Sequence, residues 1–406
     1  MADVLWTGGV QAQRQIDTLT VTTAAVGAVY IATVNGKAAS YTGVTGDTTA
    51  TIATAWAAAF AGVQDGEIAE LAAAAGATAG TVLVTGPTDG APFTMTVTAT
   101  GGGAASRATT TAAKSPADVG DAGNYSTGAL PIAGDRLVVE NFAGSLSYNL
   151  AALTALAVSL VRRASHTGVV GLSDVSARGY REYRPTHLEV RGLAHAVETT
   201  RGDGVGAVRI RGVSTTGGAL TVVGDGAASL GAEPVELYDG TAWTVSVSNS
   251  GVGLARTAPK AVGVTTLRVL DSAVTVGAGA TVGAATLTNA AAAVAGAVTT
   301  LALDRDGTAT VVRAGSVATA LTVDAGTVSW QSTANPPAAA VGSGGTLTFE
   351  AAPAGVTPGL ITLNEGATLL DPAGRLAKPY DVRLSRTEVT RVSLDFGTDF
   401  KLTVGT

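Results

Sequence analysis

Residues 265–303 read TTLRVLDSAVTVGAGATVGAATLTNAAAAVAGAVTTLAL. Short apolar segments recur in this stretch and beyond it. Several of them have the same form: two or three small residues, then Leu, a variable residue, and Val or Leu. The residues that head these segments are Leu267, Leu287, Leu301, Leu321 and Leu347. Irregular spacings of roughly 20 residues, with Gly or Asp-Gly turns between the segments, are typical of β-solenoids whose coils carry loops of variable length. We therefore predict a right-handed β-solenoid, with an irregular antiparallel β-sandwich as the alternative.

The composition of the whole chain agrees with a mainly β fold. Hydrophobic residues make up 46% of the 406 residues, yet aromatic residues make up only 4% and charged residues only 14%, so the core consists of small side chains. Val and Thr recur together, and both favour pleated strands. The 53 glycines supply the positive φ angles that tight turns need.

The predicted repetitive β body spans residues 186–379. Its expected strands are short, apolar and separated by glycine turns: His187–Val190, Ala207–Ile210, Ala219–Val223, Trp243–Val247, Thr265–Val269 and Ala318–Val323. Residues 380–406 alternate apolar and polar positions and carry more charge. We expect this last segment to be a C-terminal β cap over the open end of the solenoid, or an oligomer contact.

The first 100 residues predict a small α+β attachment module. Asn35-Gly36 lies between two apolar runs and favours a type I′ hairpin turn. Ile52, Trp56 and Phe60 recur at helical spacing within 48–62, behind a capping residue at Asp47 or Thr48. Residues 101–123 lack large apolar side chains and are predicted to be a linker. Residues 124–185 are then a turn-rich region that connects the module to the β body and caps the N-terminal end of that body.

Several classes of protein are not expected. The net charge is −6, so the chain as a whole lacks the positive field of a nucleic-acid-binding protein. Cysteine is absent, which excludes disulfides and thiolate sites. Residues 284–303 are apolar but too rich in Gly and Thr for a membrane helix, so we expect no membrane insertion. Residues 1–15, MADVLWTGGVQAQRQ, lack the basic and apolar regions of a secretory signal peptide.

The sequence gives little support for a catalytic site or a metal-binding site. Glycosidase chemistry needs two carboxyl groups at a set separation, and the densest acid pairs are Asp304 with Asp306 and Asp395 with Asp399. Both pairs adjoin Gly and favour turns. The three histidines, His166, His187 and His195, show no metal-binding spacing, and the glycine-rich runs lack a phosphate-binding context. We therefore predict a protein without enzymatic activity, metal or cofactor.

The best candidate surface is the segment RGYREYR at 178–184. Its Tyr180, Arg181, Tyr183 and Arg184 are of the residue types that dominate protein–protein interfaces, and the same types can stack on sugars. Trp6 is a lone large side chain near the N-terminus and is a further interface candidate. A solvated loop is the alternative interpretation of 178–184.

Two groups of motifs resemble phage proteins. VNGKAASYT, GDTTATIATAWAAAFA and PFTMTV, all in the first module, resemble a small module of tailed-bacteriophage structural proteins. NYSTGALPIAGDRLVVE, LAALTALAVSL and YREYRPTHLEV resemble uncharacterised prophage proteins that end in β-solenoid-like repeats. The likeness covers the first half of the chain well. In the second half only the general character of the sequence, short repeated apolar segments, is similar.

The resemblance implies a virion structural protein that acts in capsid decoration or in fibre assembly and adhesion. Its implied partners are other virion proteins of the capsid or tail, and a homo-oligomer, with a trimer expected for such fibres. The protein would fold in the host cytoplasm and leave by lysis. A tail-associated spike that binds or depolymerises a host-surface glycan is the alternative function.

Overall fold

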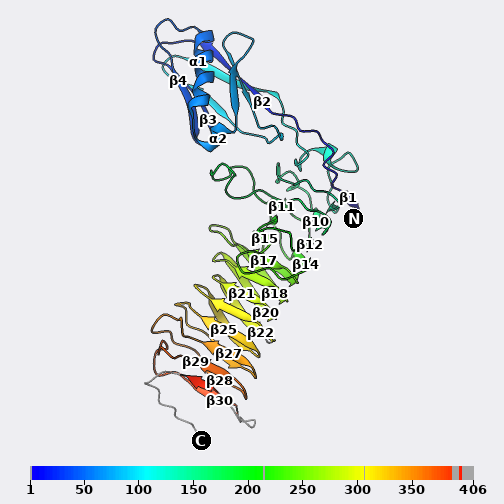
Figure 1. Cartoon of the computed structure of the whole chain (residues 1–406), viewed down its shortest axis with the longest axis vertical. Coiled ribbons are helices and arrows are strands. Elements are labelled where there is room, and N and C mark those ends of the chain that lie inside the picture. The colour runs from blue at the N-terminus through cyan, green and yellow to red at the C-terminus, as the bar shows by residue number, and fades with distance from the viewer. Residues whose placement is uncertain (1, 214, 306, 386–392, 396–406) are drawn as a thin grey trace.

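The computed structural model describes residues 2–213, 215–305, 307–385 and 393–395. It confirms a mainly β protein with a β-solenoid of about 12 turns and a small N-terminal α+β module. Figure 1 shows the solenoid as an elongated column, with the module (blue) at one end. Every strand pair in the solenoid body is parallel, which excludes the antiparallel sandwich. The right-handed sense of the coil stays a prediction.

The solenoid consists of two parallel sheets, and from β10 onward each turn adds one strand to each, whereas β1 and β9 belong to the larger sheet alone. The larger, 13-stranded sheet runs in the order that follows. Its strands are β1 (Asp3–Leu5), β9 (Arg136–Val139), β10 (Ser159–Arg162), β12 (Ala194–Thr199), β14 (Ala219–Gly224), β16 (Trp243–Ser248), β18 (Val262–Leu270), β20 (Ala280–Thr288), β22 (Ala297–Leu303), β24 (Ser316–Val323), β26 (Ala338–Val341), β28 (Ile361–Leu363) and β30 (Val382–Leu384).

The second sheet has 11 strands in the part of the chain that the structure describes. They are β11 (Leu188–Val190), β13 (Val208–Gly212), β15 (Val235–Tyr238), β17 (Gly251–Leu254), β19 (Ala273–Val276), β21 (Ala291–Val294), β23 (Ala309–Val312), β25 (Gly326–Trp330), β27 (Gly345–Thr348), β29 (Thr368–Leu370) and β31 (Ser393–Asp395).

The solenoid core is a column of stacked small side chains between the two sheets. Leu267, Ala285, Leu301 and Leu321 occupy one register position in successive strands of the larger sheet. Since alternate residues of a strand face opposite sides, this register keeps the same face buried in every turn. Two of the five predicted segment heads lie elsewhere. Leu287 pairs with Val269, two residues further along its strand, and Leu347 belongs to the second sheet.

The N-terminal module has its own core. A four-stranded antiparallel sheet contains β5 (Ala72–Ala75), β6 (Thr81–Thr85), β2 (Ile16–Thr23) and β8 (Ala104–Thr111). A three-stranded sheet contains β4 (Lys37–Thr42), β3 (Val29–Val34) and β7 (Thr96–Ala99). Two α-helices, α1 (Thr49–Gly62) and α2 (Gly66–Ala69), complete the module, and a short 3-10 helix, η1 (Ala122–Asn124), follows it.

The predicted helix and hairpin of the module are confirmed. Thr48 caps α1 by accepting a hydrogen bond from the Thr51 backbone, in a reciprocal capping box that typically stabilises a helix by about 1 kcal/mol. Ile52, Trp56 and the other apolar residues of that face are buried. At the β3–β4 turn both central residues have positive φ, as a type I′ turn requires.

The domain boundaries differ from the prediction in three places. β1 pairs with β9, so the N-terminal residues belong to the solenoid and the module is an insertion between its first two strands. The predicted linker, 101–123, contains β8, which pairs along β2. β8 lies at a sheet edge and is half exposed, so it needs no large apolar side chains. The predicted connecting region, 124–185, contains β9 and β10, which belong to the first turns of the solenoid.

The predicted C-terminal cap, 380–406, lies largely outside the described residues. Its described strands extend the two sheets in parallel: β30 pairs with β28, and β31 pairs with β29. These two strands therefore add a further turn to the solenoid. Asp399 and Asp306, which the sequence pairs with Asp395 and Asp304, also lie outside the described residues.

Candidate functional site

Two chain segments run side by side between the module and the solenoid. Gln13, on the way into the module, and Lys114, on the way out, form an antiparallel bridge with backbone N···O distances of 2.8 and 3.0 Å. An insertion held by two paired segments has less freedom to rotate than a domain on a single linker. The module is therefore fixed at its base.

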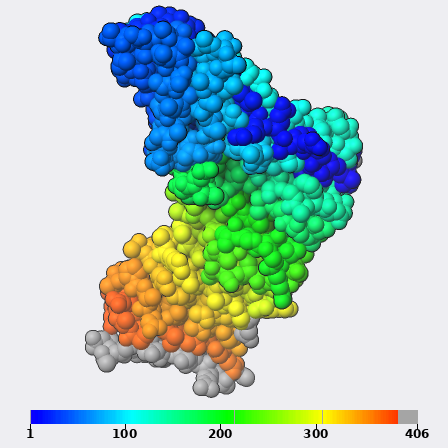
Figure 2. Space-filling view, turned by 45° about the horizontal axis from the view of Figure 1, so that its top comes forward, coloured from blue at the N-terminus to red at the C-terminus, as the bar shows by residue number. Residues whose placement is uncertain are grey.

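A long loop of the solenoid supports the module from below. This loop, residues 172–186, is called the strap here, and it joins β10 to β11 in the chain. Its tip is a tight turn in which Ser176 donates to the carbonyl of Tyr180 and Gly179 has positive φ. Figure 2 shows the green surface of the strap directly beneath the blue module. The strap is anchored to the solenoid by an ion pair of 2.9 Å between Lys260 and Asp174.

The strap grips a single carboxylate of the module. The hydroxyls of Tyr180 and Tyr183 donate to the two oxygens of Glu70, at 2.8 and 3.2 Å. The Arg184 guanidinium donates to the Tyr180 hydroxyl at 2.7 Å and lies 3.6 Å from Glu70. Burial, assisted by the hydrogen bond to Glu70, raises the pKa of Tyr180, so its hydroxyl stays a donor at all ordinary pH values. A Cβ at Gly66 of α2 would lie 2.9 Å from the Tyr180 ring, so this close approach requires glycine.

The five interface candidates from the sequence therefore have different surroundings. Tyr180, Tyr183 and Arg184 form a contact within the chain, between strap and module. Trp6 is only 3% exposed and packs edge-on against Tyr125, with ring centroids 5.2 Å apart, inside the first turn of the solenoid. Arg181 is exposed. Of the five side chains, Arg181 is the one fully available to another molecule.

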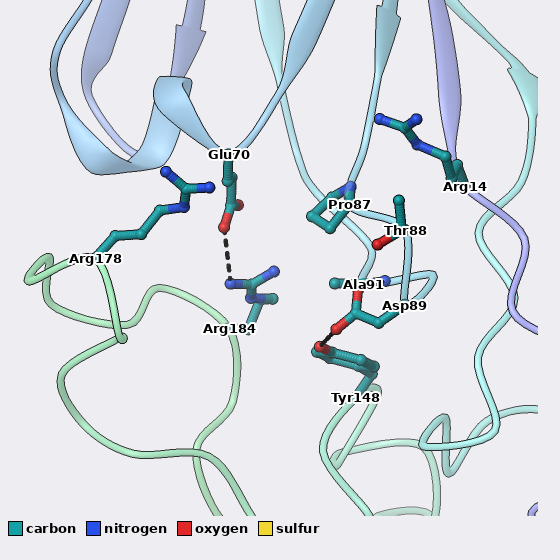
Figure 3. Close-up of a pocket in the computed structure, with 9 residues that line it drawn as sticks. All are labelled: Arg14, Glu70, Pro87, Thr88, Asp89, Ala91, Tyr148, Arg178 and Arg184. Carbon is teal, nitrogen blue, oxygen red and sulfur yellow. Dashed lines mark hydrogen bonds and ion pairs between the residues drawn. The ribbon is translucent and has the colours of Figure 1, made fainter.

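A cleft of about 350 Å³ opens beside this contact (Figure 3). The module forms one wall and the solenoid the other, and a second bridge closes the floor. There the Tyr148 hydroxyl donates to Asp89 Oδ2 at 2.6 Å, while Asp89 Oδ1 accepts from the backbone of Ala91. The residues that line the cleft are Arg14, Glu70, Pro87, Thr88, Asp89, Ala91, Tyr148, Arg178 and Arg184.

The cleft contains both positive and negative side chains, but only some of its arginines are paired with a carboxylate. Arg184 is engaged with Glu182, at 2.8 Å, and with Glu70. Arg14 donates to the Gly86 carbonyl at 2.7 Å. Neither Arg14 nor Arg178 forms a salt bridge with any residue that the structure describes. Two guanidinium groups thus face the cleft without a carboxylate of their own. The sequence pointed to Arg178 through the RGYREYR segment but gave no signal for Arg14, Glu70, Asp89 or Tyr148.

A second cluster of charges lies on the outer face of the 11-stranded sheet, near the strap. Arg211 bridges Glu189 and Asp239, at 2.6 and 3.0 Å. Arg256 lies 3.4 Å from both Glu233 and Glu236. The sequence did not reveal this grouping of acids, because its members are far apart in the chain. Glu233 is fully buried, so its carboxylate is not open to a substrate.

The electrostatics of Glu236 do not suit acid catalysis. Burial raises the pKa of Glu236, but the neighbouring His187, Arg209 and Lys260 outweigh it and hold that pKa below its usual range. The described carboxyl groups with a resolved shift all have a lowered pKa. A general acid in glycoside hydrolysis needs a raised pKa to hold its proton near neutral pH. Each of these groups is instead a stable anion.

The remaining candidates of the sequence are separate from one another. His166, His187 and His195 are all buried, and burial lowers the pKa of each. Asp304 is exposed at a turn. The described residues contain no group of three or more His, Cys, Asp or Glu side chains that could hold a metal ion.

Comparison with known proteins adds no identity. No protein-family model matches the chain, and no curated protein matches its sequence. Within the described ranges, neither helix has the length and apolar character needed to span a bilayer. The candidate site therefore stands on its geometry alone.

Proposed function

We propose that this chain is a non-enzymatic structural protein of a bacteriophage particle, which decorates the capsid or forms a fibre and acts in assembly and adhesion. The observation that carries the proposal is the attachment of the module. It is inserted between β1 and β9 and gripped by the strap, so a load on the module passes directly into the solenoid sheets. That is how a rigid adapter is built, and the phage-like motifs of the module supply the context.

The rest of the molecule supports a role as an elongated spacer. The solenoid stacks parallel strands along one axis and extends away from the module (Figure 1). Parallel strands add about 4.8 Å of length for each turn. We propose other virion proteins as partners, a homo-oligomer as the assembled form and the virion as its location, after folding in the host cytoplasm.

The alternative is a tail-associated spike that binds or cleaves a host glycan. The acid cluster that contains Glu236 and Asp239 favours it, because both side chains are partly exposed, at 17% and 41%. The lowered pKa of Glu236 argues against the cleaving form. Incubation of the protein with host capsule distinguishes the two: a release of reducing sugar that is lost in Asp239→Asn and Glu236→Gln variants would establish the enzyme.

The main proposal is tested on particles from cells that produce this chain. Mass spectrometry measures its copy number, and cryo-electron microscopy locates its density. Many symmetric copies on the shell would support decoration. A few copies at the tail would support a fibre or receptor-binding role. Complete absence from purified particles would overturn the virion proposal.

A further inference from the structure

We infer that the cleft between module and strap binds a carboxylate-bearing sugar unit, as found in acidic polysaccharides. This inference deepens the adhesive role proposed above and rests on it for the source of the ligand. Its basis is the cleft lined by Arg14, Arg178 and Asp89 (Figure 3), whose volume of about 350 Å³ lies within the range of small-molecule sites.

The charge balance of the cleft selects for an anion. Arg14 and Arg178 are exposed cations without a salt-bridge partner among the described residues, in a chain whose net charge is −6. Guanidinium groups bind carboxylates through two parallel hydrogen bonds, and this planar geometry is specific. Arg14 and Arg178 lie at opposite ends of the cleft (Figure 3), so a carboxylate at either end would give one of these cations the partner that it lacks.

The acids of the same cleft select against a bare anion. Glu70 and Asp89 also line it, and they would repel a sulfate or a phosphate dianion, each of which brings two negative charges. Sugar hydroxyls, in contrast, donate hydrogen bonds to carboxylates. The exposed Thr88 hydroxyl lies beside Asp89 and offers a further polar contact. A ligand with one carboxylate and several hydroxyls is complementary to both signs of charge at once.

The cleft is also preformed, which lowers the cost of binding. Arg184 is held by Glu182, by Tyr180 and by the carbonyl of Pro92, at distances of 2.8, 2.7 and 3.2 Å. Tyr148 is fixed by its 2.6 Å bond to Asp89. Because these groups of the cleft wall are ordered before the ligand arrives, their ordering adds no entropy cost to binding.

The test measures binding of a glucuronic acid oligosaccharide to the full-length protein by isothermal titration calorimetry. The matched neutral probe is a glucose oligosaccharide of equal length, and inorganic phosphate is the simple-anion probe. The test variant is Arg14→Gln/Arg178→Gln. The control variant is Arg191→Gln/Arg313→Gln, which removes two exposed arginines of the solenoid and the same amount of charge. Circular dichroism verifies that both variants fold.

We expect the wild type to bind the acidic oligosaccharide and to show at least tenfold weaker binding of the neutral oligosaccharide and of phosphate. The Arg14/Arg178 variant should lose at least tenfold in affinity, and the control variant should bind as the wild type does. Equal binding of acidic and neutral sugars, equal binding of phosphate, or an equal loss in both variants would overturn the inference. None of these results depends on whether the protein is found in particles, so the virion proposal can fail separately.

Discussion

Arg162 offers the sharpest test of how the solenoid tolerates buried charge. It lies in β10, is 0% exposed, and donates to both carboxylate oxygens of Asp203 at 2.6 and 2.9 Å. It also donates to the carbonyls of Glu198 and His166, at 2.5 and 2.7 Å. The Asp203 side chain is only 6% exposed. Replacement of Arg162 by Met would leave this carboxylate and two carbonyls without these donors.

Removal of one partner of a buried, hydrogen-bonded ion pair typically costs about 3–5 kcal/mol, because the other charge stays buried and uncompensated. We therefore expect Arg162→Met to lower the free energy of unfolding by about 4 kcal/mol. The matched control is Arg163→Met in the next position. Arg163 is 48% exposed in its salt bridge to Glu198, and an exposed pair contributes about 1 kcal/mol or less.

Urea unfolding followed by circular dichroism measures both variants, and hydrogen exchange shows whether β10 and β12 open first. Joint replacement in Arg162→Met/Asp203→Leu should recover much of the loss, since no charge is then left unpaired. An equal, small effect of Arg162→Met and Arg163→Met would refute the reasoning. So would a double variant that loses the sum of the two single effects.

Three further results are expected. Tyr180→Phe should increase hydrogen exchange in the strap and in α2, since it removes the bond to Glu70, worth about 1–3 kcal/mol; unchanged exchange would show that the strap does not hold the module. Burial lowers the pKa of His195 to about 4, so the free energy of unfolding of the wild type should fall by up to about 3 kcal/mol as the pH falls from about 6.5 to 4. Urea denaturation of His195→Gln over the same pH range should not show this decrease. Deletion of residues 281–296 should leave a folded protein one turn shorter, because Ala297 occupies the register position of Thr281; an unfolded product by circular dichroism would contradict the stacking.

The sign of the His195 effect follows from its hydrogen bonds. Its Nδ1 accepts from the backbone of Leu160 at 3.0 Å, so the ring is neutral and Nε2 donates to the Gly192 carbonyl at 2.8 Å. A proton on Nδ1 would remove that acceptor and place a charge in the core. The unfolded chain accepts the proton at a higher pH than the folded one, so acid favours unfolding.

The architecture was predictable because the solenoid repeats a local pattern. Leu267, Leu301 and Leu321 share one register position, and the small residues around them imply closely spaced sheets. Leu287 and Leu347 fit the same local pattern but occupy other positions. The reason is that each turn contains two strands of similar composition, and the sequence pattern does not tell one sheet from the other.

The insertion of the module was not predictable from the same pattern. β1 has three residues, too few to show a periodicity, and its partner β9 begins at Arg136. β8 consists of small and polar residues, which edge strands accept but which also characterise linkers. In both cases the pairing partner, and not the local sequence, decides the structure.

The candidate site was only half visible for a related reason. The close spacing of Tyr and Arg residues in the sequence indicated Tyr180, Tyr183 and Arg184 as contact residues, because such clusters are rare in a chain with few aromatic residues. Their partner, Glu70, is an ordinary acid 110 residues away from Tyr180. Arg14 and Asp89 are equally ordinary in sequence. A cleft formed between two parts of a chain has no local signature, since its walls meet only after folding.

The distribution of charge along the solenoid connects the fold to the proposed function. Buried or half-buried ion pairs, such as Arg162 with Asp203, Arg211 with Glu189 and Arg256 with Glu233, lie in the turns next to the module. The core of the turns from β18 to β24 is instead built from Val, Leu and Ala, with short connections. Uniform small residues suffice to stack one turn on the next, whereas costly buried charges must be matched individually. The end of the solenoid next to the module, where the cleft lies, therefore depends on particular matched residues. The remaining turns do not, so their number can vary without altering the cleft.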